Sequence, residues 1–373
     1  MATKRNEYRP ETVSHPGLTL AEKLKELGMG NKEFSVRVNK PEKTITAITK
    51  GYSSITAEMA VKFEDVLKIP ASFWLSRQRR YDEYKARVKR NEDIQNAVEW
   101  AKGFPYAKMA NLGWVEKTRK VEAKVLALFD FFGISDHKAW TSYYFEQELK
   151  VNFRISLAHT NEAMAVSAWL RQGEKKAKEI TTNPFNPQLL KNSLNEIKTI
   201  MENHPENFFE RLQEVCFKAG VIVLYTPCLP KAPVHGSTRW LGDTPLIQLS
   251  ARYKTNDKFW FTFFHEIGHI LLHGKKYISI ENVNYSDQDF DKEKEADEFA
   301  IKWTFSEDEE REVINAAPLS SDDILNFAKK FNTHPALIIG RFHKKELIHY
   351  SVGREFIESI DLERTNGNKT YKQ

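Results

Sequence analysis

Apolar residues between positions 18 and 80 recur every three or four residues, in short runs separated by turn-forming residues. This spacing places the apolar side chains on one face of a helix. Glycines follow the first run and the third, where they can end a helix. The pattern predicts a bundle of short helices, with runs at 20–27, 31–38, 42–50 and 56–68.

The middle and the C-terminal part of the chain have different patterns. Residues 81–200 have a helical composition with lysine- and arginine-rich faces. Beyond residue 205, short apolar runs typical of buried strands, such as GVIVLY at 220–225, alternate with helical periodicity. This change predicts helices at 206–220, 291–305, 320–332 and 334–348, strands at 221–227 and 245–250, and a loop at 228–244.

One apolar stretch contains three polar side chains that are costly to bury. In FWFTFFHEIGHILLHG, residues 259–274, His265 and His269 are four residues apart, which places both imidazoles on one face of a helix. Glu266 lies between them and can reach a water molecule on a metal ion that both histidines hold. Because burying the three groups unpaired would cost several kcal/mol, the pattern predicts a Zn²⁺ site with Glu266 as the catalytic base.

The third protein ligand should come from a later helix, because a catalytic zinc site needs three protein ligands and an open position. Glu293 lies near the apolar face of the predicted helix at 291–305 and is the first candidate, and Glu295 is the second. Asp297 is a candidate partner for a ligating histidine. We interpret His273, at the end of the apolar stretch, as a helix-capping residue and not as a ligand.

This set of side chains predicts hydrolysis of a peptide bond. The zinc ion would lower the pKa of its water and polarise the substrate carbonyl. Glu266 would take the proton of that water and pass it to the leaving amine. His235 and Arg239 are candidates for stabilising the oxyanion, but they fit an ordinary polar loop equally well.

The composition limits which cellular compartment and which binding partners we expect. The chain has 373 residues, a formal net charge of +5 and a pI of about 8.8, which permits nucleic-acid contact without requiring it. Cys216 and Cys228 match no zinc or redox spacing. The start MATKRNEYRP has no apolar run, and no stretch approaches the roughly 18 apolar residues of a membrane helix. We therefore expect a cytoplasmic protein without a membrane partner.

Three stretches of the C-terminal part occur together: HGSTRWLGDTPLIQLS, FWFTFFHEIGHILLH followed by EKEADEFA, and NTHPALIIGRFHKKELI. With this combination, about residues 205–345 resemble the ImmA/IrrE metallopeptidases. The resemblance implies a zinc-dependent protease, often one that cuts a repressor protein in stress response or mobile-element control. It also implies that His265, His269 and Glu293 hold the metal and that Glu266 is the catalytic glutamate.

The N-terminal part contains HPG at 15–17, a glycine after the third helical run, ITAEMA at 55–60 and PASFWL at 70–75. With these markers, residues 15–84 resemble the HigA-type antitoxin branch of the XRE helix-turn-helix proteins. The resemblance implies that the third helix lies in the major groove of DNA and reads bases from its N-terminal end. The residues that this places at bases are Glu42, Lys43, Thr44, Thr46 and Lys50, and those placed at phosphates are Lys32 and Arg37.

The turn before this third helix departs from the family pattern of a glycine, an apolar residue and a serine or threonine. Here the three positions hold Asn39, Lys40 and Pro41. Asparagine tolerates the left-handed backbone of such a turn, and proline is acceptable at a helix start. Lys40 is the unusual residue, because an apolar side chain normally fills the core there.

Together these patterns predict a mainly α, multidomain protein. We expect an all-α HigA/XRE-like helix-turn-helix domain at 1–84, a helical linker domain at 85–200, an α+β zincin-like (gluzincin) metallopeptidase domain with a small sheet at 201–350, and a tail at 351–373. The expected function is transcription regulation with a zinc-dependent endopeptidase, in a toxin–antitoxin or stress-response operon. Expected partners are operator DNA, a protein substrate, toxin or repressor, and a second copy as a homodimer. The alternative is a repressor or antitoxin whose zinc domain is a non-proteolytic sensor or partner-binding module.

Overall fold

The computed structural model describes residues 12–152, 160–232, 234–250, 255–276, 279–280 and 290–362. The chain divides into two compact units, Met1–Asn96 and Ala97–Gln373. Helices dominate both, and one small sheet lies in the second unit, which confirms the predicted fold class. The finer domain boundaries at 84, 200 and 350 stay a prediction. Among the described residues, every helix is too short or too polar to span a bilayer.

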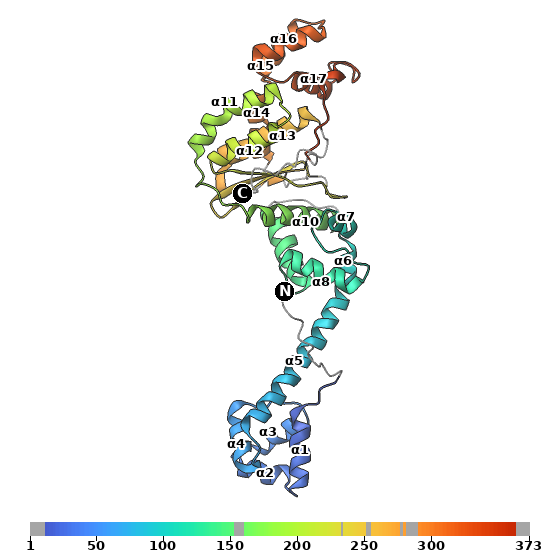
Figure 1. Ribbon diagram of the computed structural model, residues 1–373, viewed down its shortest axis with the longest axis vertical. Helices are drawn as coiled ribbons and strands as arrows, with labels where there is room; N and C mark the ends of the chain where they lie inside the picture. The colour runs from blue at the N-terminus through green and yellow to red at the C-terminus, as the bar shows by residue number, and fades with distance from the viewer. Residues whose placement is uncertain are drawn as a thin grey trace. The chain divides into compact units, whose positions relative to one another are not determined.

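The first unit is a bundle of helices around an aromatic core. Phe34, Phe63 and Trp74 are completely buried there, with ring centroids 5.1 and 5.8 Å apart in sequence order. The helices agree with the apolar periodicity to within a residue or two at most ends. They are α1 (Pro16–Glu26), α2 (Asn31–Arg37), α3 (Glu42–Thr49), α4 (Ala57–Leu67) and α5 (Ala71–Asn96) (Figure 1).

The turn between α2 and α3 accommodates its three unusual residues separately. Asn39 has a φ of 47°, the left-handed backbone that asparagine tolerates. Pro41 directly precedes α3 with a φ of −59°. Lys40 does not fill the core as an apolar residue would: its Nζ lies 2.9 Å from Oε1 of Glu58 on α4, with the lysine side chain 19% exposed. The aliphatic stem therefore covers the bundle while the charge reaches an acidic partner at the surface.

The second unit begins with a helical segment that has its own aromatic cluster. Trp100, Phe104, Phe132 and Trp140 are buried and pack largely edge to face. The elements are α6 (Val98–Lys102), α7 (Tyr106–Asn111), α8 (Val121–Phe132), α9 (His137–Trp140), the π-helix η1 (Thr141–Asn152) and α10 (Thr160–Ala177).

A four-stranded sheet follows, with the strand order β1-β3-β2-β4. Strand β1 (Ile222–Tyr225) runs parallel to β3 (Thr244–Leu249), while β2 (Gly236–Leu241) pairs antiparallel with β3 and with the short β4 (Ser279–Ile280). The predicted loop at 228–244 is therefore wrong in part, because it contains β2. The sequence GSTRWL has no apolar alternation, and its place in the sheet depends on pairing with strands on both sides.

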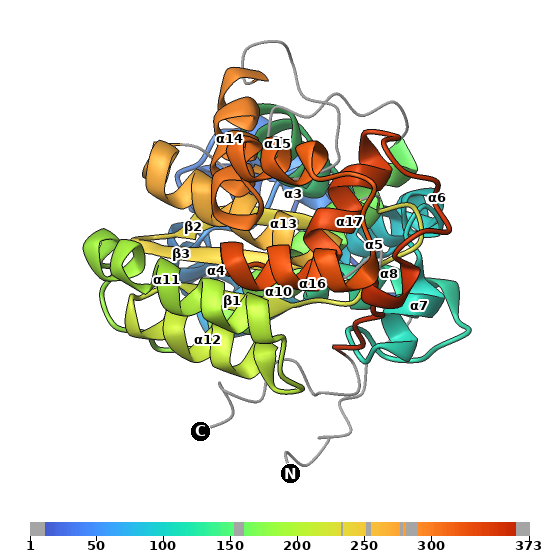
Figure 2. The same ribbon diagram turned by 90° about the horizontal axis from the view of Figure 1, so that it is seen from above.

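Helices cover both faces of this sheet (Figure 1). Alternate strand residues divide between the two faces: Val223 and Ile247 join the larger core, and Leu224 and Leu246 join a small cluster with Ala177 of α10. The larger core is built by α11 (Pro187–Asn203), α12 (Phe208–Lys218) and α13 (Asn256–Gly268), and Figure 2 shows α11 and α12 side by side. On the other face, α10 binds the sheet through Trp169, whose indole donates to the Thr226 carbonyl.

The C-terminal helices extend the unit beyond α13. Helix α14 (Phe290–Thr304) packs along α13 and joins the larger core. The next three form a separate small core, α15 (Glu307–Asn315), α16 (Ser321–Phe331) and α17 (Pro335–Lys344). Helix α15 was not predicted, because it begins with a Ser306–Glu309 capping box but contains only two apolar residues, Val313 and Ile314. Short helical turns complete the chain at η2 (His269–His273), η3 (Gly274–Lys276) and η5 (Arg354–Phe356).

Candidate metal centre

The predicted zinc residues lie at the C-terminal end of α13, deep in the second unit. His265 is 3% exposed, Glu266 0% and His269 1%. Phe259, Trp260, Phe263 and Phe264 are buried on the same helix, so the polar groups depend on one another and on neighbouring elements for partners. After Gly268 the helix widens into the π-helical turn η2, and Gly274 then reverses the chain with a φ of 60°.

The structure brings together the three side chains predicted to hold the metal. The Nε2 atoms of His265 and His269 face each other at 2.9 Å. The carboxylate of Glu293, on α14, lies 3.3 Å from the first of these nitrogens and 3.4 Å from the second. One ligand atom from each of the three residues lies within 4.8 Å of the others. A single ion can therefore contact one atom of each side chain.

Contacts on the far side of each imidazole set its tautomer. Nδ1 of His265 lies 2.9 Å from Oδ1 of Asp297, and because the carboxylate only accepts, this nitrogen carries the proton. Nδ1 of His269 lies 3.0 Å from Nδ1 of His273, whose Nε2 is 2.9 Å from Oε2 of Glu295. The second contact makes His273 Nε2 the donor to Glu295, so His269 Nδ1 donates to His273. The Nε2 lone pairs of His265 and His269 then face Glu293.

The surroundings of His269 and Glu293 favour the protonation states in which these side chains bind a cation. Burial lowers the pKa of His269 to about 4, with the Glu293 carboxylate opposing that shift, so the imidazole is neutral at physiological pH. Burial alone would raise the pKa of Glu293, but the neighbouring His265 and His269 hold it well below its usual range. A neutral imidazole and an ionised carboxylate are the protonation states that metal ligation requires.

These residues fit a zinc ion better than a hard cation. Two imidazole nitrogens and one carboxylate are a donor set typical of catalytic zinc, which keeps a fourth position for water or substrate. Calcium and magnesium prefer sites made of oxygen ligands. The donor atoms of His265, His269 and Glu293 thus agree with a metal of the zinc type.

Glu266 is enclosed against the edge of β2. Its backbone carbonyl accepts a hydrogen bond from the Thr238 hydroxyl at 3.2 Å. Gly236 faces its side chain so closely that a Cβ on this glycine would lie 2.6 Å from Oε1 of Glu266 and 2.9 Å from Cγ2 of Thr262. The missing side chain at position 236 therefore provides the space in which the Glu266 carboxylate sits.

The two candidates for an oxyanion donor differ in position. Arg239 points to the opposite face of the sheet, where its guanidinium donates to the Leu170 carbonyl of α10 and, at 3.0 Å, to Oε1 of Gln248. It is only 8% exposed, so it is a structural residue that joins the sheet to α10. His235 directly precedes Gly236, and its backbone carbonyl accepts from Ser250. Of the two, only His235 lies next to the strand end that adjoins Glu266.

The residues expected to contact DNA lie on α2, on α3 and at the end of α3. Arg37 is already paired with Glu33 at 2.6 Å, and the Thr46 hydroxyl accepts from Asn31 at 3.4 Å. Thr44 and Thr46 are half-buried. The other four predicted residues have exposed side chains at the surface of the bundle: Lys32, Glu42, Lys43 and Lys50.

Two features of the candidate metal centre differ from the sequence-based expectation. His273, expected to cap the helix, contacts both His269 and Glu295. The spacing of 265, 269 and 273 was a signal, since every fourth residue lies on one helix face. Gly236 had no predicted role, because only the packed structure shows how closely β2 approaches Glu266.

Comparisons with known proteins identify both ends of the chain. Residues 216–338 match the family model of the IrrE N-terminal-like domain, a peptidase family designated M78, and residues 20–74 match a helix-turn-helix model. No curated protein matches the chain. The chain therefore combines a DNA-binding type of domain with a domain of a metallopeptidase family.

Similar solved structures include two that each cover about a fifth of this chain. A HigA-family antidote protein of an addiction module from Coxiella burnetii is 33% identical, with 22% of this chain and 91% of that chain covered and a TM-score of 0.21. Antitoxin HigA of Pseudomonas aeruginosa, with the higBA promoter, is 23% identical over 23% of this chain and 94% of that chain, with a TM-score of 0.22. The predicted resemblances at both ends are confirmed by the family models: residues 20–74 form a helix-turn-helix domain of the XRE type, and residues 216–338 form an IrrE N-terminal-like domain of the M78 metallopeptidases.

Proposed function

We propose that this protein is a DNA-binding transcriptional regulator with a zinc-dependent endopeptidase in the same chain. The observation that carries the proposal is the meeting of His265, His269 and Glu293 around one point, with Glu266 buried beside them. The neutral imidazole of His269 supplies a lone pair and the ionised carboxylate of Glu293 supplies the negative charge that favour a divalent ion. The helix-turn-helix domain supplies the link to DNA.

The residues have distinct roles in the proposed reaction. His265, His269 and Glu293 hold the ion, while Asp297 and His273 fix the orientation of the two imidazoles. When bound, zinc supplies Lewis-acid polarisation of the scissile carbonyl and of the attacking water. Glu266 takes the proton from that water and returns it to the leaving amine.

The proposed substrate is a regulatory protein, and the proposed setting is a toxin–antitoxin or stress-response operon. A peptidase attached to a DNA-binding domain is brought to one operator, where the proteins within reach are repressors, toxins or a second copy of the chain. Tethering raises the effective concentration of such partners. We therefore propose narrow specificity and not general peptide digestion.

On the DNA side, we propose that the chain binds an operator as a homodimer, with α3 in the major groove. The exposed side chains of Lys43 and Lys50 lie on and after this helix. In a mobility-shift assay with its own promoter, the full chain should bind a palindromic site and lose affinity steeply as salt rises, because phosphate contacts release counterions. Absence of a shift at low salt would contradict this part.

The peptidase is tested by comparing Glu266→Gln with the unchanged full chain. The variant should keep one zinc per chain by metal analysis and lose cleavage of the partner encoded beside the gene by about a thousandfold or more, since it removes only the base. His265→Ala, by contrast, should lose both the zinc and the cleavage. Cleavage that persists in Glu266→Gln would show that this residue is not the base.

The second candidate is a repressor or antitoxin whose metal domain senses a signal without cleaving protein. One observation favours it: Arg239, expected as an oxyanion donor, is committed to α10 and Gln248 on the other face of the sheet. In that case zinc binding should change promoter affinity equally in the unchanged chain and in Glu266→Gln. Partner cleavage by the unchanged chain alone would exclude the candidate.

A further inference from the structure

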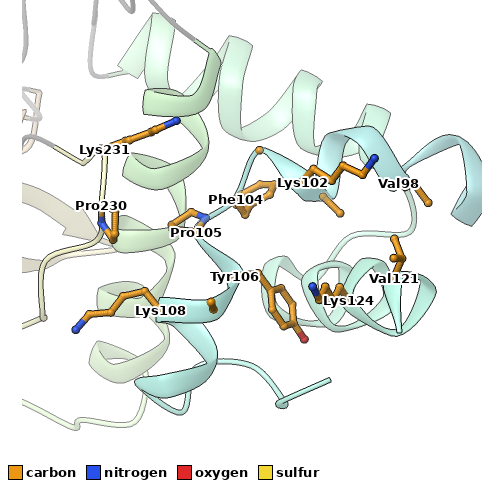
Figure 3. A pocket seen from close by; sticks show the side chains of 13 residues that line it. Val98, Lys102, Phe104, Pro105, Tyr106, Lys108, Val121, Lys124, Pro230 and Lys231 are labelled. Carbon is orange, nitrogen blue, oxygen red and sulfur yellow. The ribbon is translucent and has the colours of Figure 1, made fainter. Parts of the chain in front are cut away.

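The second unit contains a pocket of about 650 Å³, and none of its lining residues is a candidate metal ligand. Its walls come from the junction of α6 and α7, from the start of α8, and from a turn at Pro230 and Lys231 in the segment between β1 and β2 (Figure 3). A volume of this size is typical of sites for small molecules. The pocket is therefore large enough for an organic ligand, and its shape comes from three separate segments.

The interior of this pocket is mainly apolar. Phe104 and Tyr106, both buried, line it together with Pro105, and Val121 and Pro230 lie on opposite sides in Figure 3. The Tyr106 hydroxyl donates to the Glu116 carbonyl at 2.7 Å, which fixes the ring. A preformed apolar surface favours a ligand with a hydrophobic body, because little conformational entropy is lost on binding.

The charged residues of the pocket are all of one sign. Four of its thirteen lining residues are lysines and none is acidic: Lys102, Lys108, Lys124 and Lys231. Within the described ranges, Lys102 is the only one of the four in an ion pair, with Glu99 at 2.6 Å. Lys124 is half-buried, with its ammonium 5.5 Å from the centre of the Tyr106 ring. Lys108, Lys124 and Lys231 have no carboxylate partner among the described residues, and their positive potential favours an anion.

The turn that carries Lys231 is built in an unusual way. Ala232 donates to the Leu229 carbonyl at 3.1 Å, Pro230 takes the second position, and Lys231 takes the third with a φ of 65°. This is the geometry of a type II turn, whose third position favours glycine. Lysine rarely adopts this left-handed backbone, and here it holds Lys231 at the wall of the pocket.

We propose that this pocket binds a small organic anion with an apolar body, such as an aliphatic or aromatic carboxylate. The apolar lining takes the body of the ligand, and the positive charges of Lys108, Lys124 and Lys231 around it attract the acidic group. The pocket wall at Pro230 and Lys231 belongs to the segment that leads directly to Gly236, which packs on Glu266. The bound anion thus contacts the same stretch of chain that borders the candidate metal centre.

The first test titrates the full chain with anilinonaphthalene sulfonate, a fluorescent anion with an aromatic body, and uses decanoate as the competitor. We expect saturable binding at one site and displacement by decanoate. The triple variant Lys108→Gln, Lys124→Gln, Lys231→Gln should bind about tenfold more weakly or worse, because the anion loses its charged partners. The control variant Lys191→Gln, Lys218→Gln, Lys329→Gln removes the same charge from exposed positions outside the pocket and should bind within about twofold of the unchanged chain.

A second variant tests the apolar part. Ala107 is an exposed lining residue, so Ala107→Trp should fill the pocket without disturbing a buried core and should abolish displaceable binding. Circular dichroism confirms that each variant is folded. Equal affinity in the pocket and control triple variants would overturn the proposal, as would displacement by inorganic phosphate at the same concentration as decanoate. Hydrogen exchange should show decanoate protecting residues 98–108 together with 226–232, and protection elsewhere alone would place the site outside this pocket.

Discussion

At the scale of single residues, the candidate metal centre depends on a glycine, because any side chain at position 236 would occupy the space of the Glu266 carboxylate. Gly236 leaves the space that the Glu266 carboxylate occupies, and Thr262 lines the same space from α13. A buried catalytic group whose position is fixed by packing is sensitive to displacements of about 1 Å, which can reduce a rate about a hundredfold. Gly236 is therefore expected to determine where Glu266 points.

Gly236→Ala tests this role. The added Cβ would lie 2.6 Å from Oε1 of Glu266, so the carboxylate must move. We expect kcat/KM for the partner protein to fall about a hundredfold, with zinc content unchanged and stability lowered by roughly 1–3 kcal/mol from overpacking. Gly30→Ala is the control, because no atom lies within 4 Å of a Cβ there. An unchanged kcat/KM in Gly236→Ala would contradict the steric argument.

Two other histidines are buried away from the metal centre. His204 Nδ1 accepts from the Trp260 indole at 3.0 Å, and the ring of His334 lies 5.5 Å from that of His204. Burial lowers the pKa of each to about 4, and the neighbouring His204 adds to the effect at His334. Protonation of His204 would also break the bond from Trp260, because the nitrogen could no longer accept.

These depressed pKa values predict a loss of stability in acid. Above about pH 6.5 both histidines are neutral in the folded and the unfolded protein, so stability is fully present. As the pH falls from 6.5 towards 4, the unfolded chain takes up protons that the folded chain does not, and the free energy of unfolding decreases. His334→Asn should make this decrease shallower in denaturant titrations, while the asparagine still caps α17. The same slope in both proteins would exclude His334 as a source.

At the scale of elements, the register of α14 decides which acidic residue meets which histidine. Glu293 and Asp297 are four residues apart and both contact His265. Glu295 is turned to the side and contacts His273. Helical periodicity ranked Glu293 before Glu295, but the distance between α13 and α14 was needed to place either of them.

Glu293→Gln and Glu295→Gln separate these two roles. Glu293→Gln removes a negatively charged metal-binding oxygen next to Nε2 of His265 and of His269, so zinc affinity should fall by about a hundredfold or more. Glu295→Gln keeps an acceptor for His273 and should weaken zinc by about tenfold or less. Competition with a zinc-binding dye measures both affinities. A larger loss in Glu295→Gln would reverse the assignment of the third ligand.

Helices with strong apolar periodicity could be predicted from the sequence. Elements that are stabilised by contacts with other parts of the chain could not. The helices at 31–37, 42–49 and 321–331 follow directly from their apolar spacing. Strand β2 and helix α15 lack such spacing. Pairing with β3 and β4 stabilises β2, while a capping box and the packing of Val313 stabilise α15. A contact with another part of the chain leaves little signal in the local sequence.

At the scale of the whole molecule, the two compact units should respond differently to loss of metal. The candidate metal ligands all lie in Ala97–Gln373, and Met1–Asn96 has its own core. A ligand that binds only the folded state stabilises the unit that contains its site.

Scanning calorimetry of the full chain with and without a chelator tests this expectation. Removing zinc should lower the Tm of the transition of the second unit by several degrees and leave that of the first unit unchanged, since ligand linkage acts only where the ion binds. Inactivating the site by His265→Ala should abolish the effect of the chelator. A chelator-dependent shift in both transitions would show that the units unfold together.

The sequence by itself determined the residue types of the candidate metal centre, because a histidine pair with an intervening glutamate on an apolar helix is costly unless an ion pairs with it. It also determined the bundle at the N-terminus, whose helices follow from local periodicity. Only the tertiary structure decided that Glu293 meets both histidines, that His273 and Asp297 orient them, and that Gly236 makes space for Glu266. These contacts join residues from different elements, and their distances are set by how the elements pack.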